Sequence, residues 1–194
     1  NAWVSLPEFY QAHATMSIPH INADLTARGE WTQTILDQLK QSDIPLSVGI
    51  GDGGHKHYFL PDAIETLLKT YPSIDALYVD DFRFDTQNQH GDLDPLAIDP
   101  HVEWLKFIVT LTKKFNKKII IRLGGLNPIL MTSNPAYRSL YDTLTANRDF
   151  VVLIYPQGGA HTILGNTSLM GLWLEGAIGQ WGIAVDSTAY SQAG

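Results

Sequence analysis

The sequence predicts an α/β fold with a parallel sheet, namely a (β/α)8 TIM-type barrel that is incomplete within these 194 residues. Short apolar runs alternate along the chain with segments of helical spacing, and this alternation is typical of parallel sheets. Polar residues follow each clear run, as they do at the ligand-binding edge of such sheets. The length suits one domain, 1–194, but a complete barrel usually needs about 250 residues. A smaller α/β fold is the alternative.

Five apolar runs are expected to form the buried strands of the sheet. Each run is short and rich in β-branched or aromatic residues, as strands that are buried on both faces usually are. The runs are Ile44–Ile50, Ala76–Asp80, Ile119–Leu123, Phe150–Tyr155 and Gly182–Asp186, and weaker candidates are Ala2–Leu6 and Ile18–Asn22. Right-handed crossovers would bring the carboxyl ends of all these strands to one edge.

Helical spacing between the runs predicts five helices. Proline near the start of three of them supports the assignment, because proline is favoured in the first helical turn, and Asn134 is a plausible N-cap. The segments are Trp31–Gln41, Leu60–Thr70, His101–Phe115, Pro135–Ala146 and Thr167–Gln180. Two long loops, Phe82–Ile98 and Pro156–Asn166, each follow a strand and are expected to lie over the carboxyl edge, where ligands bind.

Composition narrows the classes of partner. The formal net charge is -7 and the sequence pI is near 5.3, which disfavours a nucleic-acid partner because such binding relies on clustered Lys and Arg. No apolar run reaches about 18 residues, so no membrane-spanning segment is expected. The chain has no Cys, which excludes disulfides and thiolate metal sites but assigns no compartment.

Polar side chains at the ends of the predicted strands are the candidate site. An unpaired charge is costly to bury, and a single Asp could simply cap the following helix, but repetition at strand after strand indicates a site. These residues are Asp52 and His55 after the first clear run, Asp80, Asp81 and Arg83 at the second, Asn127 at the third, Tyr155 and Gln157 at the fourth and Asp186 at the fifth.

The Asp80-Asp81 pair is expected to be split by the alternation of the strand. Adjacent side chains of a strand point to opposite faces, so one carboxylate would face the barrel mouth and the other the helices. Alternation alone leaves open which of the two faces the mouth.

Cofactor and metal motifs are absent from the sequence. The Gly51–Gly54 turn lacks the lysine of a phosphate-binding loop and the spacing of a dinucleotide fingerprint. His55 and His57 alternate as metal ligands can, but no further ligand motif accompanies them. The acidic loop that contains Asp85, Asp92 and Asp94 lacks the spacing of an EF-hand. We therefore expect no cofactor and no metal.

The C-terminal part carries a family resemblance. Thr167–Glu175 (TSLMGLWLE) and Gln180–Ser187 (QWGIAVDS) resemble the helix–strand segment of glycoside hydrolase family 98. Ile44–Leu46, Tyr71–Ser73 and Val102–Lys106 are similar to the order of elements in the same family. The resemblance covers nearly the whole chain.

The resemblance implies a (β/α)8 barrel that hydrolyses internal β-glycosidic bonds with inversion, on blood-group-type galactosides or on xylan. Asp81 stands where the family has its general-acid Glu, and Asp186 stands at the base position. The resemblance thus implies that Asp81 faces the mouth, and by alternation Asp80 is expected to point elsewhere. A Glu that assists the base would lie beyond Gly194. Two carboxyl groups at one barrel mouth suit this chemistry, because one protonates the leaving oxygen and the other activates water.

The functional expectation is therefore an inverting endo-glycosidase with a carbohydrate substrate and catalytic Asp81 and Asp186. Further carbohydrate-binding domains outside the chain and a secreted or cell-surface location would fit it. Two alternatives stay open, a glycan-binding barrel without activity and a metal-dependent hydrolase or deacetylase that uses Asp52, His55 and His57. The expected substrate-binding residues are Asp52, His55, Asp80, Arg83, Asn127, Tyr155, Gln157 and Trp181.

Overall fold

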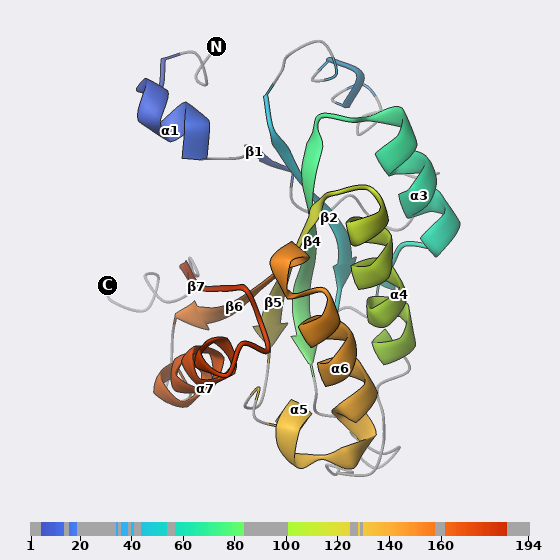
Figure 1. Ribbon diagram of the computed structural model, residues 1–194. Helices are drawn as coiled ribbons and strands as arrows, with labels where there is room; N and C mark the ends of the chain where they lie inside the picture. The colour runs from blue at the N-terminus through green and yellow to red at the C-terminus, as the bar shows by residue number, and fades with distance from the viewer. Residues whose placement is uncertain are drawn as a thin grey trace.

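A parallel sheet with helices packed on one side forms the centre of the computed structural model (Figure 1). The structure describes residues 5–13, 16–18, 34, 36–38, 40, 44–53, 57–83, 101–124, 128, 130–157 and 162–185. The strands are β1 (Met16–Ile18), β2 (Leu46–Asp52), β3 (His57–Tyr58), β4 (Ile74–Arg83), β5 (Lys118–Gly124), β6 (Val151–Gln157) and β7 (Gln180–Val185).

The order of the strands in the sheet is β1-β2-β4-β5-β6-β7, and β3 pairs antiparallel with β2. All other pairings are parallel. Each parallel strand is thus followed in the sheet by the next parallel strand of the chain, which is the strand order of a (β/α) barrel. The predicted α/β fold with a parallel sheet is confirmed, while the incomplete (β/α)8 barrel stays a prediction.

All five clear strand predictions match observed strands. The largest difference is at β4, which continues to Arg83 and so takes up the start of the expected 82–98 loop. The weak candidate Ile18–Asn22 shares only Ile18 with β1. Ser5 and Leu6 form a turn and a bend, not a strand, and the short helix α1 (Glu8–His13) after them was not expected.

The helices are α3 (Pro61–Thr70), α4 (His101–Lys114), α5 (Leu130–Ser133), α6 (Arg138–Ala146) and α7 (Thr162–Leu174), with 3-10 turns at Pro135–Tyr137 and Arg148–Phe150. The predictions for α3 and α4 are confirmed. The segment predicted as Pro135–Ala146 begins with a 3-10 turn, whose N-cap Asn134 accepts a hydrogen bond from the backbone of Ala136 at 2.9 Å. Of the segment predicted as Trp31–Gln41, Thr34 and residues 36–38 are helical.

The bounds predicted for the last helix were wrong. It begins at Thr162 rather than Thr167 and ends at Leu174 rather than Gln180. Its composition gives the physical reason, because α7 is apolar almost all round and carries no charged residue that would mark a solvent-facing side. Glycine marks its end, since Gly176 has a φ of 72°.

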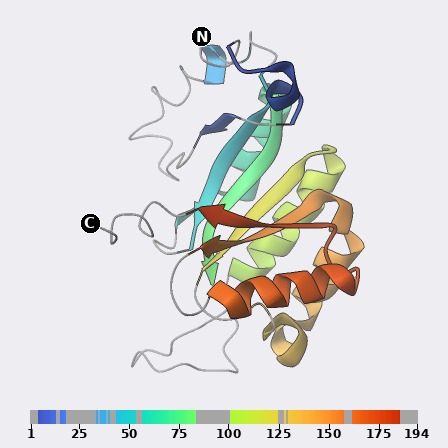
Figure 2. The same cartoon turned by 90° about the vertical axis from the view of Figure 1, so that its left-hand side faces the viewer.

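The helices α3, α4 and α6 lie on one side of the sheet, as Figure 2 also shows. Leu77 and Val79 of β4, Ile119 and Ile121 of β5 and Leu153 of β6 are buried against them. We call this side of the sheet the helix face. Every second residue in the middle of β4, β5 and β6 therefore belongs to the core.

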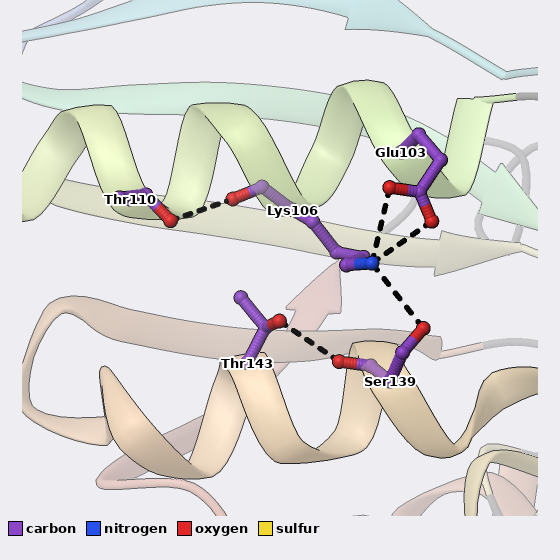
Figure 3. A network of polar contacts seen from close by, with 5 residues as sticks. All are labelled: Glu103, Lys106, Thr110, Ser139 and Thr143. Atoms are coloured by element: carbon purple, nitrogen blue, oxygen red, sulfur yellow. Dashed lines mark hydrogen bonds and ion pairs between the residues drawn. The ribbon is translucent and has the colours of Figure 1, made fainter.

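Helices α4 and α6 pack side by side, and a small polar network links them (Figure 3). Lys106 of α4 donates to both carboxylate oxygens of Glu103, at 2.9 and 3.0 Å, and to the hydroxyl of Ser139 on α6 at 3.3 Å. Such exposed ion pairs contribute little to stability. The network belongs to the surface of the helix layer and lies away from the carboxylates of the strands.

Candidate active site

The residues between the core positions of β4 and β5 form the second face of the sheet. Tyr78 and Asp80 alternate with the buried Leu77 and Val79, and Arg122 follows the buried Ile121. These three side chains are half-buried rather than buried. We call this second side of the sheet the Asp80 face.

A β-bulge at the end of β4 breaks the alternation of the strand. Val79 pairs with Ile121 and Phe82 pairs with Leu123, so Asp80 and Asp81 together lie opposite Arg122. A bulge puts two residues against one and bends the strand. Phe82 consequently returns to the helix face, where it is fully buried.

The expected split of Asp80 and Asp81 was wrong for this reason. Asp80 lies on the face with Tyr78 and Arg122, and Asp81 has a φ of 47°, which is left-handed backbone. Non-glycine residues adopt this conformation at a cost, although Asp tolerates it better than most, and such residues often occur at functional sites. The two carboxylates are therefore neighbours on one face.

Two donors hold the Asp80 carboxylate. The guanidinium of Arg122 donates to Asp80 Oδ1 through Nε, and the hydroxyl of Tyr78 donates to the same oxygen at 3.2 Å. Among the described residues, none donates a hydrogen bond to Oδ2. The Asp80 and Arg122 side chains are only 15% and 19% exposed, so the ion pair is shielded from water and stronger than a surface pair.

The pKa values of the two donors keep both of them protonated. Burial raises the pKa of Tyr78 to about 12, and the negative charge of Asp80 adds to the rise. Burial works to lower the pKa of Arg122, but the hydrogen bond to Asp80 and the attraction of its charge outweigh this and raise the pKa above its usual range. Asp80 thus faces one cation and one neutral donor throughout the physiological range of pH.

Glycines on each side of β4 make room for the bulge, Gly124 within β5 and Gly53 directly after β2. A side-chain carbon at Gly124 of β5 would overlap Asp81 Oδ1 and lie 2.6 Å from its Cγ. On the other side, a side-chain carbon at Gly53 would lie 2.9 Å from the carbonyl carbon of Asp81, and the Gly53 N–H donates to the Asp80 carbonyl at 2.8 Å. Because Gly124 follows Arg122 by two residues, its missing side chain would point to the Asp80 face, and the Asp81 carboxylate occupies that space.

Asp52 adds a third carboxylate beside the first two. It ends β2 and pairs in register with Asp80. Paired residues of parallel strands point to the same face, and neighbouring strands lie roughly 4.8 Å apart. Asp52, Asp80, Asp81 and Arg122 therefore form one polar row across the carboxyl ends of β2, β4 and β5.

The structure places two other predicted site residues away from this row. Tyr155 is 4% exposed and packs on the helix face, where its ring carbon Cδ1 would lie 2.6 Å from a side-chain carbon at Gly165 of α7. Trp181 pairs with the buried Leu153 and packs against the same core. Both residues were expected to bind substrate, but strand register assigns them to the core side.

The remaining predicted residues are only partly described. Arg83 and Gln157 occupy the last positions of β4 and β6, at the same edge as the polar row. His55, Asn127 and Asp186 lie outside the described residues. The candidate base is therefore a prediction, and so is its separation from Asp81.

Arg122 and Tyr78 are the site residues that the sequence analysis missed. Both lie inside a strand, whereas the predicted site rested on polar residues at strand ends. The signal was present, however, because an Arg within the apolar run IIIRL needs a buried anion as partner.

Within the described part of the chain, no three His, Asp or Glu side chains gather closely enough to hold a metal ion. The described helices also include none that is long and apolar enough to cross a membrane.

Comparison with solved structures identifies the fold. The chain shares its fold with the catalytic module of a family 98 glycoside hydrolase from Streptococcus pneumoniae TIGR4. Its native form matches with a TM-score of 0.67 at 15% identity, and its complex with the H-disaccharide blood group antigen matches with a TM-score of 0.68 at 16% identity. A complex with the LewisY pentasaccharide blood group antigen matches with a TM-score of 0.67.

These matches cover 94% of this chain but 32% of the solved one, so the chain spans about a third of the length of the module it resembles. Neither a protein-family model nor a curated protein matches the chain. The resemblance to family 98 noted in the sequence is confirmed at the level of the fold.

Proposed function

We propose that this chain carries catalytic residues of an inverting endo-glycosidase. The observation that supports this most directly is the bulge, which holds Asp80 and Asp81 side by side at the carboxyl end of β4 with Asp52 next to them. The carboxyl edge of the strands is where enzymes of this architecture work. The fold shared with a glycoside hydrolase module supports hydrolysis of a glycan.

In this proposal Asp81 is the general acid and Asp186 is the general base. Asp81 protonates the oxygen of the leaving sugar, and Asp186 takes a proton from the water that attacks the opposite face of the sugar ring. Inversion needs the two carboxyl groups to be about 6.5 to 9.5 Å apart, so that water fits between acid and base. Asp52 and Asp80 bind hydroxyl groups of the substrate.

The proposed substrate is an extracellular glycan with internal β-linkages, of the blood-group galactoside or xylan type. The blood-group antigens bound by the solved modules make the first class the better starting point. A secreted or cell-surface location, with further carbohydrate-binding domains, would suit such a substrate.

The deciding assay is the release of reducing ends from blood-group glycans and from xylan, with proton NMR of the first product to determine its anomeric configuration. Asp81→Asn should suppress cleavage of natural glycans but spare activated aryl glycosides, because these need little protonation of the leaving group. Asp186→Asn should abolish cleavage of both, because the amide cannot accept a proton from water.

Asp149→Asn is the matched control, since Asp149 is 84% exposed at the amino end of β6, and its replacement should leave cleavage unchanged. A product that retains its configuration would contradict the inverting mechanism. Wild-type rates for Asp186→Asn would remove Asp186 from the base role.

The ion pair between Arg122 and Asp80 favours a second candidate, which is glycan binding without cleavage. A carboxylate tied to a guanidinium is a good acceptor for sugar hydroxyls and needs no catalytic partner. This candidate predicts that the protein binds the same glycans and releases no reducing ends.

A further inference from the structure

The Asp80 carboxylate uses only one of its two oxygens in the described structure. Arg122 Nε and the Tyr78 hydroxyl both donate to Oδ1, and both come from the floor of the Asp80 face, one from β5 and one from β4 itself. Because a carboxylate is planar, two fixed donors on one oxygen also fix the direction of the other. Oδ2 therefore has a fixed direction, although neither Arg122 nor Tyr78 donates a hydrogen bond to it.

We propose that Arg122 is a positioning residue that holds Asp80 so that Asp80 Oδ2 accepts hydrogen bonds from hydroxyl groups of the substrate sugar. This inference rests on the proposed function, and it adds the residue through which Asp80 acts. Arg122 itself does not touch the sugar in this account.

The chemistry of the row supports this division of roles. An ionised carboxylate forms short, strong hydrogen bonds with hydroxyl donors, whereas an Arg that spends its Nε on Asp80 serves as a counter-charge. Without the guanidinium, Asp80 would be a half-buried anion beside Asp52 and Asp81, and like charges at such distances repel each other. The Asp80 side chain would then turn toward water, and Oδ2 would no longer have a fixed orientation.

The arrangement predicts an effect on binding rather than on the chemical step. Asp80 contacts a bound sugar equally before and during bond cleavage, so its loss weakens uniform binding and raises KM with little change in kcat. Lys at position 122 keeps the charge but cannot reproduce the Nε geometry, so it should restore only part of the affinity.

The test measures calorimetric Kd for blood-group and xylan oligosaccharides, and KM and kcat on whichever is cleaved, for the full protein and its variants. Arg122→Met should raise Kd and KM about tenfold or more, with kcat changed less than about threefold, and Arg122→Lys should fall between Met and wild type. Arg138→Met is the matched control, because Arg138 pairs with Asp142 on the exposed side of α6 and its loss should leave Kd unchanged.

A double-mutant cycle links the two residues. The variant with both Arg122→Met and Asp80→Asn should bind no more weakly than Asp80→Asn alone, since both changes remove the same contact. If Arg122→Met does not fold by circular dichroism, Tyr78→Phe carries the test, because it deletes one donor to Oδ1 and should raise Kd about threefold.

Three results would overturn the inference. The first is an unchanged Kd for Arg122→Met, or for Tyr78→Phe in its place, when Asp80→Asn does weaken binding. The second is a fall in kcat with KM unchanged for the same variant. The third is full additivity in the double-mutant cycle. If the wild-type protein neither binds nor cleaves any of these glycans, the proposed function fails and the inference fails with it. Because binding is measured directly, a protein that binds but does not cleave still decides the role of Arg122.

Discussion

The carboxylate of Asp81 lies directly against the α-carbon of Gly124 on the neighbouring strand. A side-chain carbon at position 124 would overlap Asp81 Oδ1. The contact explains why β5, in which the other positions are all large residues, ends in glycine. It also links the candidate acid to a residue that has no chemistry of its own.

Gly124→Ala should therefore impair catalysis by moving Asp81. A misplacement of about 1 Å can cost roughly a hundredfold in rate, and we expect a loss of that order in kcat. The overlap should also lower the free energy of unfolding by about 1–3 kcal/mol. Initial rates on glycans and urea denaturation measure the two effects.

Gly171→Ala is the control for that substitution. A side-chain carbon there would meet nothing within 4 Å, and Gly171 lies within helix α7. Alanine should keep wild-type activity and raise stability by up to about 1 kcal/mol. Wild-type rates for Gly124→Ala would show that Asp81 does not depend on the space at position 124.

The left-handed backbone of Asp81 predicts an ordering of variants. Asp81→Gly and Asp81→Ala both remove the carboxylate and should both be inactive on natural glycans, but only glycine relieves the strain at a φ of 47°. The glycine variant should be more stable than the alanine variant by about 1 kcal/mol. Differential denaturation of the two proteins measures this difference.

Asn116 offers the same comparison away from the site, because its φ is 55° in the turn after α4. The Asn116→Gly variant should be more stable than the Asn116→Ala variant by a similar amount, and both variants should remain active. Equal stability of the two Asp81 variants would mean that Asp81 does not hold this conformation in solution.

The raised pKa of Tyr78 predicts a loss of stability at alkaline pH. The pKa is about 12 in the folded protein against 10 for an ordinary tyrosine, so the folded state binds more protons between these values. Stability is then independent of this group below pH 10 and falls as the pH rises from 10 through 12.

The difference in unfolding free energy between wild type and Tyr78→Phe, followed by chemical denaturation across this range, isolates the effect from other tyrosines and lysines. We expect the advantage of wild type to shrink with rising pH. A difference that stays constant with pH would contradict the assigned pKa.

Gly165→Ala should destabilise the protein through the core rather than the site. The new methyl group would meet the ring of Tyr155, with Cζ at 2.5 Å, and the ring is almost fully buried. We expect a loss of about 1–3 kcal/mol in unfolding free energy. Thermal melting measures this loss, with Gly171→Ala in the same helix as the control. The kcat of the folded fraction should stay at the wild-type value because Tyr155 lies on the helix face.

The fold was predictable because its signals are periodic. The run IIIRL has the length and composition of a buried strand, and the strand is where the run predicts it. Short elements carry no such period, which is why the two-residue strand β3 and the helix α1 were not expected. The predicted bounds of helix α7 were wrong because apolar residues lie on almost all sides of this helix. Without a polar side, the sequence has no periodic pattern whose start and end would mark the helix.

The site was only partly predictable because it depends on one departure from regularity. Strand ends led to Asp52, Asp80 and Asp81, and the structure brings all three to one face. Alternation then predicted the wrong orientation for Asp80, since no local pattern in YVDDFR announces a bulge. The bulge depends on Gly53 and Gly124, which are distant from Asp81 in the sequence. The residues next to Asp81 in the sequence therefore do not indicate these contacts.

The flanking glycines also define what would have to move with the acidic pair if it were transplanted. Gly53 and Gly124 come from opposite sides of β4, 71 positions apart in the numbering, yet both leave open the space that Asp81 occupies. A protein engineer who grafted only Asp80 and Asp81 onto a regular strand of another parallel sheet would obtain two aspartates on opposite faces of that strand. The unit that would have to be transferred therefore combines residues from three neighbouring segments of the sheet. A chain that acquired it by single mutations would need the two glycines before the two aspartates, because the aspartates fit only where the glycines leave space.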